Sequence, residues 1–377
     1  MLVSCARSTN LTVGGCESGR SRPRNIDFPV VETVLFAPKL FQPVQMMLNL
    51  SEDSLKLKSK AVAILCGVVV LLGLGSSLFA KPNFIRQSQE TTKTLVERLG
   101  YPRDTKLLIV HADDLGMAHS INAATIKAFE TGLVNSGSIM VPCPWLPEIA
   151  AYARANPNAD LGLHLTLSSE WKLYRWGSVL PKDRVSSLFD KSGYLYPTES
   201  EAAARISPKE AEAEIRAQIE RAKSFGIQPT HLDSHMGTLY QTKELFEALI
   251  KVGHDHKLPM RIARGQFTSH PYLKDLLGPN DVVIDNVISI EPSVTAEGWA
   301  NYYLEAIKNL SPGVSEMIIH LAYDDGEMKG IAFEHPDWGS QWRQRDFDFF
   351  TSDAFRKALE TNNVKLITWR ELGKLVR

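Results

Sequence analysis

The chain has 377 residues, with 42 Lys and Arg against 43 Asp and Glu, and a formal net charge of -1. Hydrophobic residues make up 44% and charged residues 23%, which is ordinary for a globular protein and excludes a collagen or a wholly disordered chain. Proteins that coat nucleic acid usually carry a basic excess, so the balanced charge argues against a nucleic-acid partner. Only Cys143 of the four cysteines lies beyond residue 80, which excludes an internal disulfide in the body of the chain.

The first eighty residues differ in composition from the rest. No residue from 61 to 80 is charged, most are apolar, and three lysines stand just before them. This order is typical of a secretory signal peptide within 56–80, and the stretch is also long enough to be a membrane anchor. We therefore expect an exported protein, periplasmic or extracellular, with anchoring through 61–80 as the alternative. Residues 1–55 are too many for the charged start of a signal, so we expect a disordered or non-native extension there.

The remainder alternates between strand and helix patterns. We expect a linker with a first helix at 81–106 and a single β/α domain at 107–377. Apolar runs predict strands at 107–110, 137–141, 160–165, 230–234, 259–262, 316–319 and 364–368. Helices are predicted around 121–129 and at 147–154, 207–225, 242–254, 300–310 and 352–360, and irregular excursions at 168–197 and 263–292. This alternation implies a parallel sheet, either open or closed into a barrel.

Polar residues that can do chemistry follow four of these strands. Asp113 and Asp114 follow the first strand, and three histidines close later ones: His164, His235 and His320. The carboxyl ends of parallel strands lie on one face, where β/α proteins build their active sites. One carboxylate and two histidines fit a metal site with open positions. Taken singly, a strand-end histidine is more often a hydrogen-bonding residue, and Asp114 could simply cap the next helix.

Several segments resemble the YdjC-like carbohydrate deacetylases. The matching stretches are LIVHADDLG at 108–116, and those at 161–167, 187–194, 229–235, 345–352 and 367–372. They extend over essentially the whole body and are specific in combination rather than singly. The sequence departs from the family at His111, where asparagine is common, and after His235, where family members often carry more histidines.

The resemblance implies a distorted β/α barrel of the TIM-like type that hydrolyses amides with one divalent metal ion, magnesium or zinc. On matching positions the metal ligands are Asp114, His164 and His235, the base is Asp113 and the late histidine is His320. A metal-activated water, a carboxylate base and a histidine acid are together suited to amide hydrolysis. If both aspartates face the site, the end of their strand must be bulged, because consecutive side chains on a strand point to opposite faces.

Further residues are candidates for supporting roles. Asp233 is two residues before His235 and is expected to orient a histidine, or only to end its strand with a hydrogen bond. Arg261 ends the 259–262 strand and is expected either to bind substrate or to form an internal salt bridge. Trp171 and Trp176 lie among cations in the 168–197 excursion, where they stack on a sugar or pack a lid on the barrel, with the lid slightly favoured.

The leading hypothesis is therefore a metal-dependent carbohydrate N-deacetylase with an N-acetylated sugar or oligosaccharide as its partner. Another metal-dependent hydrolase, such as a phosphoesterase, is the first alternative, because the same three ligands can also activate water for attack at phosphorus. A sugar-binding barrel without turnover is the second alternative. A homodimer also belongs to these expectations.

Overall fold

The computed structural model describes residues 93–376. The extension at 1–55, the stretch at 56–80 and the start of the linker at 81–106 lie outside these residues. The described part of the linker contains one short helix, α1 (Leu95–Arg98), which Thr94 and Glu97 close with reciprocal cap hydrogen bonds. No helix in residues 93–376 is long and apolar enough to cross a membrane.

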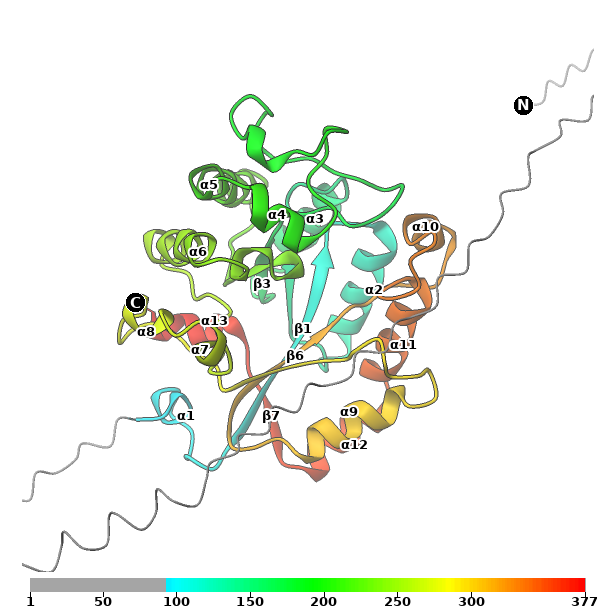
Figure 1. Cartoon of the computed structure of the whole chain (residues 1–377). Coiled ribbons are helices and arrows are strands. Elements are labelled where there is room, and N and C mark those ends of the chain that lie inside the picture. The colour runs from blue at the N-terminus through cyan, green and yellow to red at the C-terminus, as the bar shows by residue number, and fades with distance from the viewer. Residues whose placement is uncertain (1–92, 377) are drawn as a thin grey trace, which may run out of the picture. The chain divides into compact units, whose positions relative to one another are not determined.

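Seven parallel strands form one sheet in the described part of the chain (Figure 1). The strands are β1 (Lys106–Leu115), β2 (Ser136–Ile139), β3 (Leu161–Leu165), β4 (Leu232–Ser234), β5 (Asn286–Ser289), β6 (Gly313–Ile319) and β7 (Val364–Leu366). Their order is β4-β3-β2-β1-β6-β5, and β7 pairs with the first residues of β1. The long, buried β1 is therefore the centre of the sheet.

Two isolated bridges join the edges of this sheet. Met260 bridges to Leu232 in β4, and Ala263 bridges to Ile284 just before β5. The circuit of pairings is thus completed by an irregular segment, and the fold is the distorted β/α barrel that the sequence predicts. The strand expected at 259–262 is reduced to these bridges, and β5 lies inside a stretch for which the sequence predicts irregular structure. Its half-exposed residues lack the apolar pattern of a buried strand.

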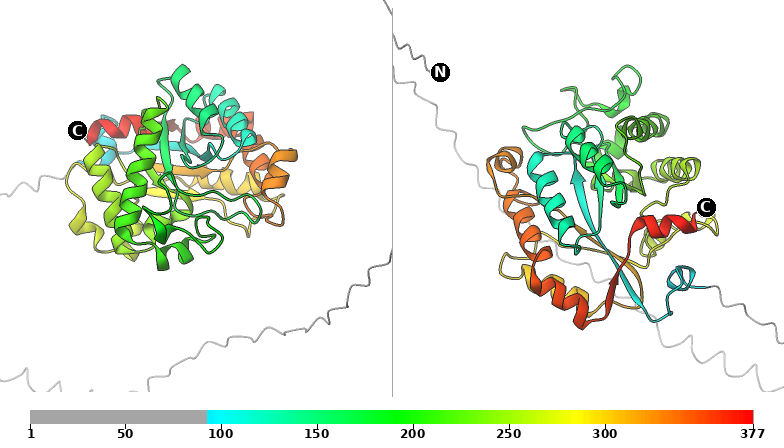
Figure 2. Two further views of the ribbon diagram at one scale, coloured as in Figure 1. Left: turned by 90° about the horizontal axis from the view of Figure 1, so that it is seen from above. Right: turned by 180° about the vertical axis from the view of Figure 1, so that it is seen from behind.

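Helices surround the strands on the outside, as the views from above and behind also show (Figure 2). The longer ones are α2 (His119–Glu130), α3 (Leu146–Ala155), α5 (Pro208–Ser224), α6 (Lys243–His256), α9 (Trp299–Lys308), α11 (Ser340–Phe350) and α12 (Asp353–Thr361). The short ones are α4 (Glu199–Arg205), α7 (Gln266–Ser269), α8 (Leu273–Leu276), α10 (Gly326–Ile331) and α13 (Trp369–Leu372).

The sequence patterns do not predict α11, and the reason is visible in its burial. This helix turns Arg343 and Asp346 inward together with its aromatic residues, so apolar side chains alone do not mark its inner face. The excursion at 168–197 does remain irregular, with one 3₁₀ turn at Ser186–Leu188. Its aromatic and aliphatic side chains pack into the main hydrophobic cluster, so the excursion is anchored to the barrel.

Candidate active site

The predicted strand-end residues meet in one cleft of about 480 Å³ at the carboxyl end of the sheet. Because the strands are parallel, residues far apart in the sequence are brought to this common end. The predicted site residues among those that line the cleft are Asp113, Asp114, His164, Trp171, His235, Arg261 and His320.

A bulge in β1 lets two consecutive aspartates face the cleft. The register between β1 and β2 shifts between Ala112 and Leu115, and Asp114 has a φ of 72°. This left-handed conformation is uncommon for a residue other than glycine, and it marks a backbone that its surroundings hold in place. It turns the Asp114 carboxylate to the same side as that of Asp113, which is the arrangement the sequence predicts.

Asp114, His164 and His235 present three donor atoms to one point. Asp114 Oδ1 lies 3.4 Å from His164 Nε2 and 3.4 Å from His235 Nδ1. Ligand bonds of about 2.1 Å in a tetrahedral metal site place neighbouring donor atoms roughly 3.4 Å apart. Asp114 Oδ1 and His235 Nδ1 are also buried without a hydrogen-bond partner among the described residues. These residues therefore fit a divalent metal ion.

A carboxylate on the far side of each histidine fixes its tautomer. His164 Nδ1 lies 2.7 Å from Asp233 Oδ1, and His235 Nε2 lies 2.9 Å from Glu170 Oε2. Since an ionised carboxylate can only accept, these ring nitrogens donate, and the opposite nitrogens, which face Asp114, would be the ones to coordinate a metal ion. Asp233 thus stands where a residue that orients a histidine is expected, and Glu170 is a second such residue that the sequence analysis did not identify.

The second oxygen of Asp114 is held by a buried arginine. Arg343 Nη2 donates to Asp114 Oδ2 at 2.7 Å, and Arg343 Nε donates to the carbonyl oxygen of Trp338. Burial alone would raise the pKa of Asp114, but the charge of Arg343 holds it well below its usual range. Asp114 is therefore an ionised carboxylate with one oxygen directed at the site.

Asp113 stands beside this group without belonging to it. Its Oδ1 lies 3.1 Å from His111 Nε2, and its Oδ2 lies 3.8 to 3.9 Å from nitrogens of His164, Arg261 and His320. Burial opposes ionisation, but the charge of His164 and the hydrogen bond from His111 lower the pKa of Asp113 to about 2. An ionised carboxylate beside a metal site is suited to accept a proton from water.

His320 differs from the sequence expectation in its pKa. Its backbone N–H donates to Asp346 Oδ2 at 3.0 Å, which fixes the end of β6 against α11. Burial, with the nearby charge of Arg343, lowers the pKa of its ring to about 4, whereas a near-neutral value is expected from the residue type alone. The ring is therefore neutral at pH 7 and must receive a proton before it can give one.

Arg261 also lines the cleft. Its Nη1 is 3.9 Å from Asp113 Oδ2, its Nε is 4.0 Å from Glu316 Oε2, and Nη1 has no hydrogen-bond partner among the described residues. Both expectations for this residue thus have a basis, because it neutralises buried carboxylates and also faces the cleft with a free donor.

The two tryptophans of the excursion have different positions. Trp171 lines the cleft but is only 1% exposed, and its indole N–H points to the sulfur of Met117. Trp176 does not line the cleft; its indole N–H donates to the carbonyl oxygen of Ser168, and its ring lies against that of His235. The excursion folds Trp176 inward as packing, which agrees with the lid alternative, and substrate contact by this residue stays an untested prediction.

Comparison with known proteins agrees with this fold. The sequence profile of the YdjC-like protein family matches residues 107–361. The chain belongs to the YdjC-like family. A carbohydrate deacetylase of Thermus thermophilus is 30% identical over 282 residues, which cover 73% of this chain and 97% of the relative. A chitooligosaccharide deacetylase of Yersinia enterocolitica is 25% identical over 266 residues, which cover 69% and 97% of the two chains.

A solved structure is similar over the same region. A protein of Enterococcus faecalis V583, provisionally named a cellobiose-phosphate cleavage protein, superposes with a TM-score of 0.61 at 25% identity. The match covers 71% of this chain and 99% of that one. The family resemblance expected from the sequence motifs is therefore confirmed.

Proposed function

We propose that this protein is a metal-dependent carbohydrate deacetylase that removes the acetyl group from an N-acetylated sugar or oligosaccharide. The observation that carries the proposal is the pairing of a three-donor metal site with a separate ionised carboxylate, Asp113, in one cleft. The family and the deacetylase names of its relatives support the same activity.

Asp114, His164 and His235 would hold the ion. When bound, a divalent metal lowers the pKa of a coordinated water and polarises the acyl oxygen of the substrate. Two of the three donors are imidazole nitrogens, which favour zinc over magnesium, because magnesium prefers oxygen ligands. Elemental analysis of the purified chain tests this assignment, and magnesium as the bound metal would contradict it.

Asp113 and His320 would move the proton. Asp113 accepts it from the attacking water at Oδ2, which lies 3.9 Å from His320 Nε2. Burial lowers the pKa of His320 to about 4, so its ring is neutral at pH 7 and can take up this proton. His320, charged in this way, protonates the amine as it leaves. The free Nη1 of Arg261 would bind a substrate hydroxyl or the acyl oxygen.

The decisive experiment measures products. The metal-loaded full chain is incubated with N-acetylglucosamine oligomers, and free acetate and free amine are quantified. The proposal predicts equal amounts of both. Release of phosphate from phosphate esters without any acetate would favour a phosphoesterase, and sugar binding without turnover would favour a sugar-binding barrel.

We also propose that 56–80 directs export, so that the enzyme acts in the periplasm or outside the cell. The support is the uncharged stretch at 61–80 behind three lysines. N-terminal sequencing of the native protein tests it, because a mature protein that still contains residues 25–40 would contradict cleavage. Retention of 61–80 in a membrane fraction would favour the anchor. The homodimer stays a prediction. A measurement of the molecular mass in solution tests it.

A further inference from the structure

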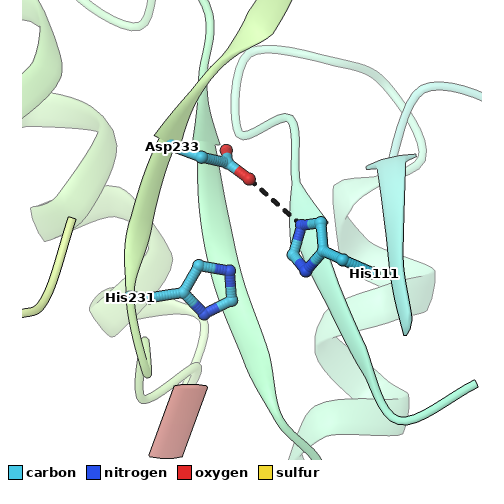
Figure 3. Close-up of side chains that lie close together, drawn as sticks. All are labelled: His111, His231 and Asp233. Carbon is cyan, nitrogen blue, oxygen red and sulfur yellow. Dashed lines mark hydrogen bonds and ion pairs between the residues drawn. The ribbon is translucent and has the colours of Figure 1, made fainter. Parts of the chain in front are cut away.

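A second buried polar cluster lies beside the metal site. It contains His111 in β1, His231 just before β4, and Asp233 in β4 (Figure 3). His111 and Asp233 point toward each other, and both side chains are fully buried. None of the three residues lines the cleft. The cluster therefore has no direct contact with substrate, yet it touches two residues of the catalytic machinery.

The hydrogen bonds of His111 decide what this cluster can be. Its Nε2 lies 3.1 Å from Asp233 Oδ2, 3.1 Å from Asp113 Oδ1 and 3.1 Å from Ser138 Oγ, and its Nδ1 lies 2.9 Å from Ser136 Oγ. The two carboxylates only accept, so Nε2 carries a proton that they share. A metal ligand needs a free lone pair on that nitrogen, so this cluster is no second metal site.

The charges around His111 also favour a protonated ring. Asp113, Asp233 and Glu316 are buried carboxylates within 3.7 Å of its ring nitrogens. Although burial opposes the charge, hydrogen bonds to the two aspartates and the field of Glu316 raise the pKa of His111 to about 10. A positive charge on buried His111 is stabilised by the neighbouring carboxylates. The same charge reduces the repulsion between those carboxylates.

We propose that His111 is a positioning residue that couples the catalytic base to the metal site. Its Nε2–H bridges Asp113 and Asp233, and Asp233 in turn accepts from Nδ1 of the ligand His164 at 2.7 Å. One ring thus sets the place of the base and, through Asp233, the orientation of a metal ligand. The role of Asp113 in this inference rests on the proposed deacetylase function, whereas the link from His111 to the metal site does not.

The first experiment compares two substitutions. His111→Leu removes both hydrogen bonds, and His111→Gln keeps an amide N–H near the position of Nε2. Loss of a residue that orients a metal ligand typically weakens metal binding about 10–100-fold, so we expect this range for His111→Leu together with a lower kcat and an unchanged KM. His111→Gln should recover most of both. His254→Gln on the exposed face of α6 is the matched control and should change neither quantity.

Metal affinity is measured by chelator competition, and bound ions are counted by elemental analysis. Metal affinity within twofold of wild type in folded His111→Leu would overturn the proposal. So would two ions bound per chain, because the shared proton on Nε2 would then be absent. If His111→Leu does not fold, His111→Gln still decides: affinity as weak as that of Asp233→Asn would show that an N–H at this position is not what matters.

A double-mutant cycle separates coupling from independent effects. In an Asp233→Asn background, His111→Gln and His111→Leu should cost no further metal affinity, because the path to His164 is already cut. In an Asp113→Asn background, at saturating metal, they should cost no further rate. Additive losses in the metal arm would overturn the proposal. If the wild-type chain binds metal but releases no acetate, the proposed function fails, while the metal arm still tests His111.

Discussion

At the scale of single residues, the geometry of the candidate metal site depends on which ring nitrogen of each histidine faces Asp114. Asp233 accepts a hydrogen bond from Nδ1 of His164, and Glu170 accepts one from Nε2 of His235. The two rings would therefore coordinate a metal ion through different nitrogens, although both stand at strand ends. This asymmetry lets a single oxygen of Asp114 lie 3.4 Å from both of them.

The ligand assignment predicts that either histidine is indispensable for metal. We expect His164→Ala and His235→Ala each to remove most of the bound ion, because two protein ligands hold a divalent metal far less well than three. Elemental analysis after gel filtration measures this loss. The matched control is His254→Ala, whose side chain is exposed and pairs with Asp281. Full occupancy in both variants would reject the assignment.

The two neighbouring aspartates should separate in their effects. Asp113→Asn keeps the ligand Asp114 and removes only the base, so we expect retained metal and a rate lower by about 10²–10⁴-fold. Asp114→Asn should instead lose the metal. Metal content and acetate release are measured on the same samples. The opposite pattern, with metal lost only in Asp113→Asn, would mean that the two roles are reversed.

His320 should matter most when the leaving group is poor. An amine leaves readily only when protonated, whereas an activated ester needs no acid. We therefore expect His320→Ala to lose far more activity on an N-acetylglucosamine oligomer than on an activated acetyl ester, with the metal site still filled. Parallel rate measurements on the two substrates check this. Equal losses on both would show that His320 does not act as the acid.

At the scale of elements, β3 and β4 pack so closely that a glycine is required between them. A Cβ at Gly162 would lie 2.4 Å from the ring of His231, and this ring stacks on Trp369 with centroids 5.2 Å apart. The ring cannot retreat without moving α13. The approach of the two strands thus depends on a residue without a side chain.

We expect Gly162→Ala to lower the free energy of unfolding by about 1–3 kcal/mol, the usual cost of overpacking a core. Gly330→Ala is the control, because a Cβ there meets no described atom within 4 Å and alanine favours the helix that contains it. Denaturant titration of both variants measures the difference. An unchanged midpoint in Gly162→Ala would show that β3 and β4 can separate at little cost.

At the scale of the whole molecule, the metal site joins distant parts of the barrel. Its donors come from β1, β3 and the turn after β4, and Arg343 of α11 holds Asp114 from the other side. Residues from across the sequence must be in place together before three donors meet. Metal binding would therefore be coupled to folding of the domain.

Removal of the metal should destabilise the fold by mass action. An ion at 100 times its Kd adds about 2.7 kcal/mol if it does not bind the unfolded chain. We expect chelation to lower the Tm of the wild-type chain and to leave that of His235→Ala almost unchanged. Calorimetry with and without chelator measures both. An equal decrease in the two proteins would place the stabilising ion elsewhere.

The amino-acid sequence by itself determined the parts of this site that depend on local pattern. Apolar runs mark the strands, and a parallel sheet collects their carboxyl ends, so strand position alone assigns Asp113, Asp114, His164 and His235 to one cleft. The bulge in β1 follows from the same pattern, because two adjacent aspartates cannot otherwise face one side. The family motifs supplied the roles that pattern alone left open.

Only the tertiary structure decided the rest, because burial and partner choice are not local properties. Glu170 lies in an irregular excursion and Arg343 on a helix with a polar inner face, so neither has a pattern that leads to the site. The low pKa of His320 comes from its burial. Trp176 turns inward because the excursion packs into the main hydrophobic cluster. The bridge from His111 to Asp113 and Asp233 exists only where β1 and β4 face each other across the barrel interior.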